Sequence, residues 1–360
     1  MIVSAYDPRS GVVTAYRSVA EGLTPDGFQF DAYGFTGWRD DTPFAGFCSR
    51  LYGPPWSLTE LLVRRRYDVI HCIDTAYEAP FFVERWLDRA RYRGGVVLCS
   101  HNSSITPLTH QPIAPHVSIA CSAASAAAMS QFVTNVRIIP NGVDIGRFRP
   151  IPTDYDGPPL LLWVGRSSDD AAKDLTGFLR VVDRHPEFRA IVVDADNDRS
   201  VAAKSNVDYR SGLTAEEMII VYNEVRASKG AVISTSRFEG MSFASLEAAA
   251  CGCPLVVPRV SGMEHLIDGE TAILYDRSDD LVGLDAALLR LDRLREHIST
   301  TGRKVVEERH TLSSMAGAHR LAYEDAIRAS KRRSFSDCLV GAGWTAALKC
   351  REALRGIWRG

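Results

Sequence analysis

The sequence has no apolar run near the ~20 residues that a membrane-spanning helix needs, although 46% of its 360 residues are hydrophobic. It also lacks a strong charge of either sign, because 42 basic and 44 acidic residues leave a net charge of −2. No overall basic field is present that would attract nucleic acid. The N-terminus is typical of a first strand and shows no basic and apolar regions of a signal peptide.

Paired cysteines with metal-ligand spacing are missing as well. The eight cysteines are scattered, and several lie in apolar stretches, where cysteine packs as a small buried residue. Cys251 and Cys253 leave a metal site open as an alternative to packing at a helix end. We expect no metal, no cofactor and a reducing, cytoplasmic setting. The length suits two domains, each with its own core.

The most informative stretch covers residues 230–258. Residues 231–235 form a short apolar run that predicts a buried strand, and residues 236–242 form a polar loop. Residues 243–251 are good helix formers, and Gly252 suits the left-handed end of that helix. Residues 255–257 begin another strand. Strand, loop, helix and strand in this order build a parallel sheet with its loops at the carboxyl edge.

Two carboxylates lie in this unit, Glu239 in the loop and Glu247 early in the helix. The loop amides of residues 240–243 approach a helix N-terminus, which favours an anion such as phosphate. A carboxylate accepts two hydrogen bonds from a pair of hydroxyl groups. A ligand with phosphates and hydroxyl pairs, such as a sugar nucleotide, fits this combination.

A second group of polar residues follows the strand predicted at residues 160–164. Arg166 comes directly after it, and Lys173 lies beyond a short polar loop. A guanidinium and an ammonium group at this edge would neutralise a diphosphate. Cations at a developing negative charge lower a reaction barrier without a metal.

Three ordered motifs resemble those of the family-four retaining glycosyltransferases of the GT-B fold, the glycosyl transferases group 1. The motifs are Glu239-Gly240 with Leu246-Glu247-Ala248 and residues 250–257; residues 138–144 with Phe148 and Pro150; and Val164-Gly165-Arg166 with Lys173. The resemblance is clear from about residue 117 to residue 300. Residues 194–198 depart from it, because Asp-Ala-Asp-Asn-Asp stands where the family has a glycine-rich turn, and contacts to the base are therefore not predicted.

The resemblance implies an α/β protein of the GT-B fold, with two doubly wound parallel-sheet (Rossmann-like) domains facing a central cleft. We expect an acceptor-side domain at residues 1–150 and a donor-binding domain at residues 151–325. Residues 326–360 would form a basic amphipathic tail, since residues 331–360 carry seven basic and two acidic side chains, a balance of +5. This tail would return to the first domain or lie on an anionic membrane surface.

The resemblance also assigns roles to single residues. Glu239 would hold hydroxyls of the donor sugar, Glu247 those of the ribose, and Arg166 and Lys173 the diphosphate. His101, which follows the strand predicted at residues 95–100, would line the sugar, with His71 as the rival position. The predicted catalytic residues are His101, Glu239, Arg166 and Lys173. The predicted donor-binding residues are Gly11, Arg166, Lys173, Glu239, Gly240, Met241, Ser242, Phe243 and Glu247.

The function implied is retaining, hexosyltransferase-type transfer from a nucleotide-diphosphate sugar to a glycan, lipid-linked or natural-product acceptor, as in polysaccharide biosynthesis. The enzyme would be cytoplasmic, with peripheral membrane contact through the tail. Two alternatives stay open. One is a non-catalytic GT-B scaffold that binds another transferase, and the other is a different GT-B enzyme such as a sugar-nucleotide epimerase.

Overall fold

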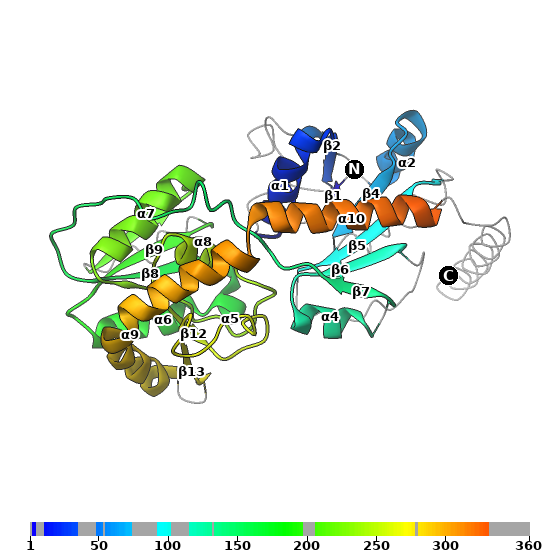
Figure 1. Ribbon diagram of the computed structural model, residues 1–360. Helices are drawn as coiled ribbons and strands as arrows, with labels where there is room; N and C mark the ends of the chain where they lie inside the picture. The colour runs from blue at the N-terminus through cyan, green and yellow to red at the C-terminus, as the bar shows by residue number, and fades with distance from the viewer. Residues whose placement is uncertain are drawn as a thin grey trace, which may run out of the picture.

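The computed structural model describes residues 2–4, 11–34, 48–52, 55–73, 92–101, 115–131, 133–196, 206–277 and 280–330. Among these residues the chain forms two parallel sheets, each in its own half of the molecule (Figure 1). Residues 331–360 of the predicted tail lie outside the described residues.

The first sheet has seven strands in the order β3-β2-β1-β4-β5-β6-β7. Every pair of neighbours is parallel. The strands are β1 (Ile2–Ser4), β2 (Phe30–Gly34), β3 (Cys48–Tyr52), β4 (Val69–Ile73), β5 (Gly95–Ser100), β6 (Val117–Ala120) and β7 (Val136–Ile138). The helices of this half are α1 (Gly11–Leu23), α2 (Pro55–Arg64) and α4 (Ala123–Met129). Strands β5 and β6 are buried at every position, as expected for parallel strands covered on both faces.

The second sheet has six strands in the order β10-β9-β8-β11-β12-β13, again all parallel. The strands are β8 (Leu160–Gly165), β9 (Arg189–Asp194), β10 (Val207–Ser211), β11 (Ala231–Ile233), β12 (Leu255–Pro258) and β13 (Ile273–Tyr275). The helices are α5 (Asp170–Lys173), α6 (Leu175–Arg184), α7 (Ala215–Ala227), α8 (Phe243–Ala250) and α9 (Asp280–Arg309). The predicted fold class is confirmed.

Local sequence signals place several of these elements. Helix α7 begins with a capping box, because Thr214 Oγ1 accepts from the amide of Glu217 at 3.3 Å and Glu217 Oε2 accepts from the amide of Thr214 at 2.7 Å. Gly252 ends α8 with a φ of 73°, the left-handed conformation predicted for it. Cys251 and Cys253 are buried beside this turn, and the Sγ of Cys253 donates to the carbonyl of Tyr222 at 2.9 Å.

The last described helix, α10 (Leu312–Ser330), leaves the second half and lies across the first sheet (Figure 1). Its buried residues Met315, Ala316, Ala322, Tyr323 and Ala326 belong to one apolar cluster with α1. We placed the returning segment after residue 325, but in the structure it begins at residue 312. The boundary differs because the apolar face of α10, from its first turn onward, packs against the first sheet and not against the second.

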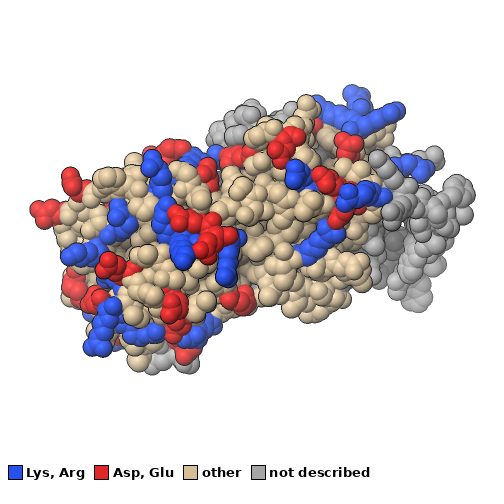
Figure 2. All heavy atoms as spheres, in the orientation of Figure 1, with Lys and Arg blue, Asp and Glu red and all other residues tan. Residues whose placement is uncertain are grey.

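The surface carries mixed charge. On the face drawn in Figure 2, acidic and basic side chains are interspersed over both halves. This distribution agrees with a net charge near zero and gives that face no broad field of one sign.

Candidate functional site

Lys173 and Glu239, predicted from separate motifs, contact each other. Lys173 ends helix α5 after strand β8, and Glu239 lies in the loop after strand β11. These strands are neighbours in the sheet, so their carboxyl ends deliver both loops to one edge. The Nζ of Lys173 lies 2.6 Å from Oε1 of Glu239, with side chains 26% and 11% exposed. The pair combines a cation suited to a phosphate with a carboxylate suited to hydroxyl groups.

Several contacts fix the position of Glu239. The hydroxyl of Ser236 donates to Oε1 of Glu239 at 2.7 Å, and the amide of Glu239 donates to the carbonyl of Ser261 at 2.9 Å. Gly262 follows with a φ of 87°, and a Cβ at this position would overlap the carbonyl oxygen of Glu239. The loop therefore needs a glycine there, and Glu239 is held in place from the side chain and the backbone.

Arg166 lies in the loop after β8 and faces a different acid. Its Nε lies 3.7 Å from Oδ1 of Asp196, and this nitrogen is buried without a hydrogen bond among the described residues. Asp196 Oδ2 accepts from the amide and the hydroxyl of Ser168 at 3.0 and 2.6 Å. Arg166 thus keeps an unused donor nitrogen at the edge where Lys173 lies. Its contact to a diphosphate stays a prediction.

Asp194, at the end of β9, has a structural role. Its carboxylate accepts from the amide and hydroxyl of Ser167 at 2.9 and 2.7 Å, and from the hydroxyl of Tyr209 at 2.6 Å. Burial alone would raise the pKa of Asp194, but these hydrogen bonds hold the pKa below its ordinary value. The residues that replace the glycine-rich turn therefore fasten the loop that carries Arg166.

Glu247 lies on α8 and is half-buried. The hydroxyl of Tyr222, a residue of α7, donates to its Oε2 at 3.0 Å. Burial raises the pKa of Glu247 to about 7, while the hydrogen bond from Tyr222 and the charge of Arg147 act in the opposite direction. Glu247 therefore changes its protonation state near neutral pH.

The two halves of the molecule meet beside these residues. A Cβ on Gly240 would overlap the carbonyl oxygen of His101 and lie 3.3 Å from Sγ of Cys121, so glycine permits this close approach. Asn141, in the predicted hinge after β7, donates its Nδ2–H to the carbonyl of Met241 at 2.9 Å. His101 of the first half is thereby brought to the loop that carries Glu239 in the second.

The ring of His101 is held by the first half. Its Nε2 lies 3.5 Å from Sγ of Cys99, and its ring centroid lies 5.4 Å from that of Tyr16 in an edge contact. Burial lowers the pKa of His101 to about 3, so the imidazole is neutral. His71, the rival position, is only 1% exposed and lies within β4, where its Nδ1 is 2.7 Å from the hydroxyl of Tyr323. His71 is a core residue and not a sugar contact.

Two of three further predicted donor residues have visible local roles, and Gly11 has none. Ser242 caps α8, because its Oγ accepts from the amide of Ser245 at 3.2 Å. Phe243 packs against the apolar cluster of the first half. Gly11 begins α1 and is exposed, and a Cβ there would meet nothing within 4 Å. Packing thus does not require glycine at residue 11, and its donor contact stays a prediction.

Sequence reasoning missed the supporting residues Ser236, Asn141 and Tyr222. Ser236 lies three positions before Glu239, and its polar loop was a signal for a helper hydroxyl. Asn141 lies within the family-like motif at residues 138–144, but that motif assigns no role to its side chain. Tyr222 has no local signal, because it lies 25 residues before Glu247 in the chain and on a different helix.

Two negative findings hold for the described ranges alone. They contain no group of three or more histidine, cysteine, aspartate or glutamate side chains that could hold a metal ion. They also contain no helix that is both long and apolar enough to pass through a membrane.

Residues 172–319 match a family model described as glycosyl transferase-like. A D-inositol 3-phosphate glycosyltransferase of Geodermatophilus obscurus is 26% identical over 226 residues, which are 54% of this chain and 49% of that protein. The chain thus spans about half the length of the curated relatives it matches.

Two solved structures resemble nearly the whole chain. Sucrose-phosphate synthase of Thermosynechococcus elongatus has a TM-score of 0.73 at 17% identity, over 91% of this chain and 98% of its own. Anabaena HepE in complex with UDP-glucose has a TM-score of 0.73 at 16% identity, over 89% of this chain and 98% of its own. At such identities the likeness shows the fold, two Rossmann-like domains of the GT-B type.

Proposed function

We propose that this chain is a group 1 (family-four) glycosyltransferase of the GT-B fold, which transfers a sugar from a nucleotide-diphosphate sugar to an acceptor with retention of the anomeric configuration. The contact between Lys173 and Glu239 carries the proposal. It brings a phosphate-binding cation and a hydroxyl-binding carboxylate to one sheet edge, as a nucleotide sugar requires.

The proposed reaction uses the side chains described above. As the bond between sugar and diphosphate breaks, negative charge grows on the leaving group, and Lys173 and Arg166 would stabilise it. Because these cations belong to the protein, the proposal needs no metal. Glu239 would hold sugar hydroxyls and Glu247 ribose hydroxyls, with amides near Met241 and Ser242 at the phosphates.

The first half would supply the acceptor side. His101 would line the donor sugar, since its backbone touches the Gly240 loop. The acceptor would attack on the face from which the diphosphate leaves, and the leaving phosphate would accept its proton. Closure of the two halves would exclude water, which otherwise competes as an acceptor. We propose a glycan, lipid-linked or small-molecule acceptor in the cytoplasm, with the basic residues 331–360 available for a membrane surface.

A thermal-shift panel of UDP-, GDP-, ADP- and TDP-sugars tests the donor site. A ligand at ~100 times its dissociation constant stabilises the fold by about 2.7 kcal/mol, which is about 4 °C for a chain of this length. UDP-glucose is the first donor to try, because HepE binds it. We expect one nucleotide class to raise the melting temperature of the wild type and to raise that of Lys173→Ala and Glu239→Ala much less.

Lys304→Ala is the matched control, because Lys304 is an exposed lysine of α9 paired with Glu308 at 3.9 Å. This variant should respond as the wild type does. If no donor raises the melting temperature of the wild type, the hypothesis of a non-catalytic scaffold replaces that of a glycosyltransferase. If a donor binds but is returned as its epimer in the absence of an acceptor, the chain is a sugar-nucleotide epimerase instead.

A further inference from the structure

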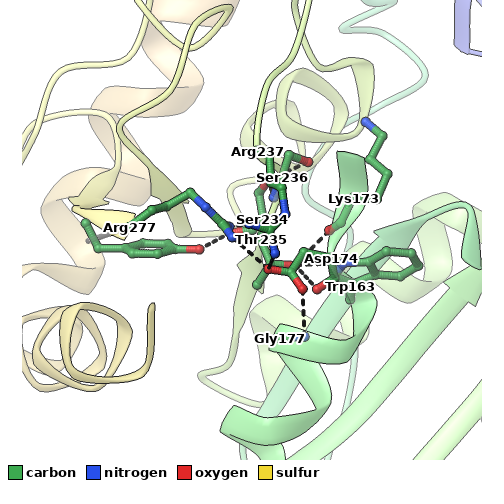
Figure 3. Close-up of polar contacts among 10 residues, drawn as sticks. Trp163, Lys173, Asp174, Gly177, Ser234, Thr235, Ser236, Arg237 and Arg277 are labelled. Atoms are coloured by element: carbon green, nitrogen blue, oxygen red, sulfur yellow. Dashed lines mark hydrogen bonds and ion pairs between the residues drawn. The ribbon is translucent and has the colours of Figure 1, made fainter. Parts of the chain in front are cut away.

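A buried network joins the two loops that carry Lys173 and Glu239. At its centre lies Asp174, the residue after Lys173, with a side chain only 5% exposed. Figure 3 shows Arg277 reaching toward Asp174 and Thr235. The sequence motifs give no role to Asp174 or Arg277.

Asp174 has an unusual backbone. Its φ of 51° and ψ of 54° lie in the left-handed region, which side-chain-bearing residues rarely adopt. Its carboxylate compensates for this, because Oδ1 accepts from the amide of Gly177 at 3.1 Å and caps helix α6. The chain thus turns sharply after Lys173, and Asp174 holds that turn.

Arg277, in the segment after β13, bonds to both loops. One of its Nη atoms donates to Oδ2 of Asp174 at 2.7 Å, and the other donates to the carbonyl of Thr235. Its side chain is 14% exposed, so solvent screens these bonds little. A single planar guanidinium therefore fixes the loop after β8 to the loop after β11.

The hydroxyl of Thr235 adds a second link. It lies 2.9 Å from the carbonyl oxygen of Lys173 and 2.8 Å from that of Asp174, so one proton is shared between the two carbonyls. The Nε1–H of Trp163 donates to the same hydroxyl at 3.1 Å. Nearby, the amide of Arg237 donates to the carbonyl of Ala172 at 2.7 Å.

These contacts lie next to Lys173 and Glu239 in the chain. Lys173 directly precedes Asp174, and Glu239 lies two residues after Arg237, whose guanidinium also reaches Oδ2 of Asp174 at 3.2 Å. The distance between Lys173 and Glu239 is therefore set by the network. We propose that Asp174 and Arg277 are positioning residues, which hold the ammonium of Lys173 where it meets the diphosphate of the donor.

This inference rests on the proposed function, and a double-mutant cycle tests it. The probes are UDP, GDP, ADP and TDP, with binding to the full chain measured by calorimetry. Asp174→Asn removes the charge but keeps a residue that tolerates the left-handed region and can cap a helix. In the wild-type background we expect it to weaken binding of the preferred diphosphate roughly tenfold.

The Lys173→Ala background separates positioning from a general loss of structure. There Asp174→Asn should weaken binding less than about twofold, because no ammonium remains to be placed. Arg277→Lys keeps the charge but loses the planar contact to both loops, and it should show the same dependence on Lys173. It also keeps the test valid if Asp174→Asn fails to fold.

Asp268→Asn is the matched control. Asp268 also bridges two guanidinium groups, of Arg259 at 2.6 Å and Arg290 at 2.9 Å, and also accepts from a backbone amide, that of Leu274 at 2.9 Å. Its loss should leave diphosphate binding unchanged. Equal weakening by Asp174→Asn with and without Lys173 would overturn the inference alone. Failure of all four diphosphates to bind the wild type would overturn the proposed function and this inference together.

Discussion

The second half of the molecule fixes its site residues with hydrogen bonds and ion pairs, whereas the first half fixes His101 with packed rings. In the second half, Lys173, Glu239 and Asp174 are tied between loops by charged and hydroxyl groups. In the first, Tyr16 contacts both His101 and His71, with ring centroids 5.4 and 4.8 Å apart.

The ring cluster continues into α10. This helix, the last one described, therefore supports the part of the first half that holds His101. His71 lies 5.9 Å from His319 between ring centroids and contacts the hydroxyl of Tyr323 at 2.7 Å. Burial lowers the pKa of His71, His101 and His319. Protonation of these buried histidines in acid should therefore destabilise the ring cluster of the first half.

The largest effect is expected where the two regions touch, on replacing Gly240 with alanine. The added Cβ would overlap the carbonyl oxygen of His101, and the backbones of both halves would have to move. We expect Gly240→Ala to lower the free energy of unfolding by about 3 kcal/mol, measured by denaturant titration, and to weaken donor binding.

Gly317→Ala, on α10, provides the control. A Cβ at Gly317 would meet nothing within 4 Å, so alanine should stabilise its helix by up to about 1 kcal/mol. A Gly240→Ala protein as stable as the wild type would show that the two halves do not pack at this point. His101 would then no longer belong to the candidate site.

The two regions also differ in how far the sequence could predict them. In the second half, the ends of two predicted strands are local signals, and they place the loops of Lys173 and Glu239 at one edge. The left-handed Gly252 is another local signal, which ends α8. Neighbouring strands in a parallel sheet bring such residues together without further information.

In the first half the decisive contacts are distant in the chain. His71 bonds to Tyr323, 252 residues away, and nothing near His71 distinguishes a buried core histidine from one that faces a sugar. The same long separation hid the start of α10, because its apolar face fits either sheet in sequence and only packing selects the first. The role of Asp174 could not be predicted for a related reason, since its partner Arg277 lies 103 residues away in the chain.

Acid should act in opposite directions through two single histidines, His319 on α10 and His185 in the second half. Burial lowers the pKa of His319 from 6.5 to about 4. Between these values the unfolded chain binds the proton and the folded chain does not, so the free energy of unfolding falls as the pH drops from 6.5 toward 4. His319 alone accounts for a loss of about 3 kcal/mol over this range. His319→Gln should flatten the slope of stability against pH in denaturant titrations.

His185 in the second half should act in the other direction. Burial would lower its pKa, but hydrogen bonds with Asp285 and Glu187 raise it above 6.5. Its contribution to stability is therefore complete below pH 6.5 and is lost as the pH rises through the folded-state value. His185→Gln should destabilise the protein more at pH 6 than at pH 9. If both variants changed the slope of stability against pH in the same direction, the opposite roles of His319 and His185 would be contradicted.

The smallest effect is expected at Glu247, the one acid of the site that burial brings to a pKa of about 7. Only the carboxylate accepts hydrogen bonds from two ribose hydroxyls, so donor affinity should rise roughly tenfold between pH 6 and pH 8 as Glu247 ionises. Calorimetric titration with UDP-glucose, or with the donor that the thermal panel selects, measures this change.

Two variants assign that pH dependence to Glu247. Glu247→Gln should bind more weakly and without a pH profile, whereas Glu307→Gln, an exposed acid of α9 paired with Arg303, should keep the wild-type profile. Tyr222→Phe removes the hydrogen bond that lowers the pKa of Glu247, so the midpoint should move to higher pH. A wild-type profile in Tyr222→Phe would mean that a group other than Glu247 controls the pH dependence, and the ribose contact would have to be assigned elsewhere.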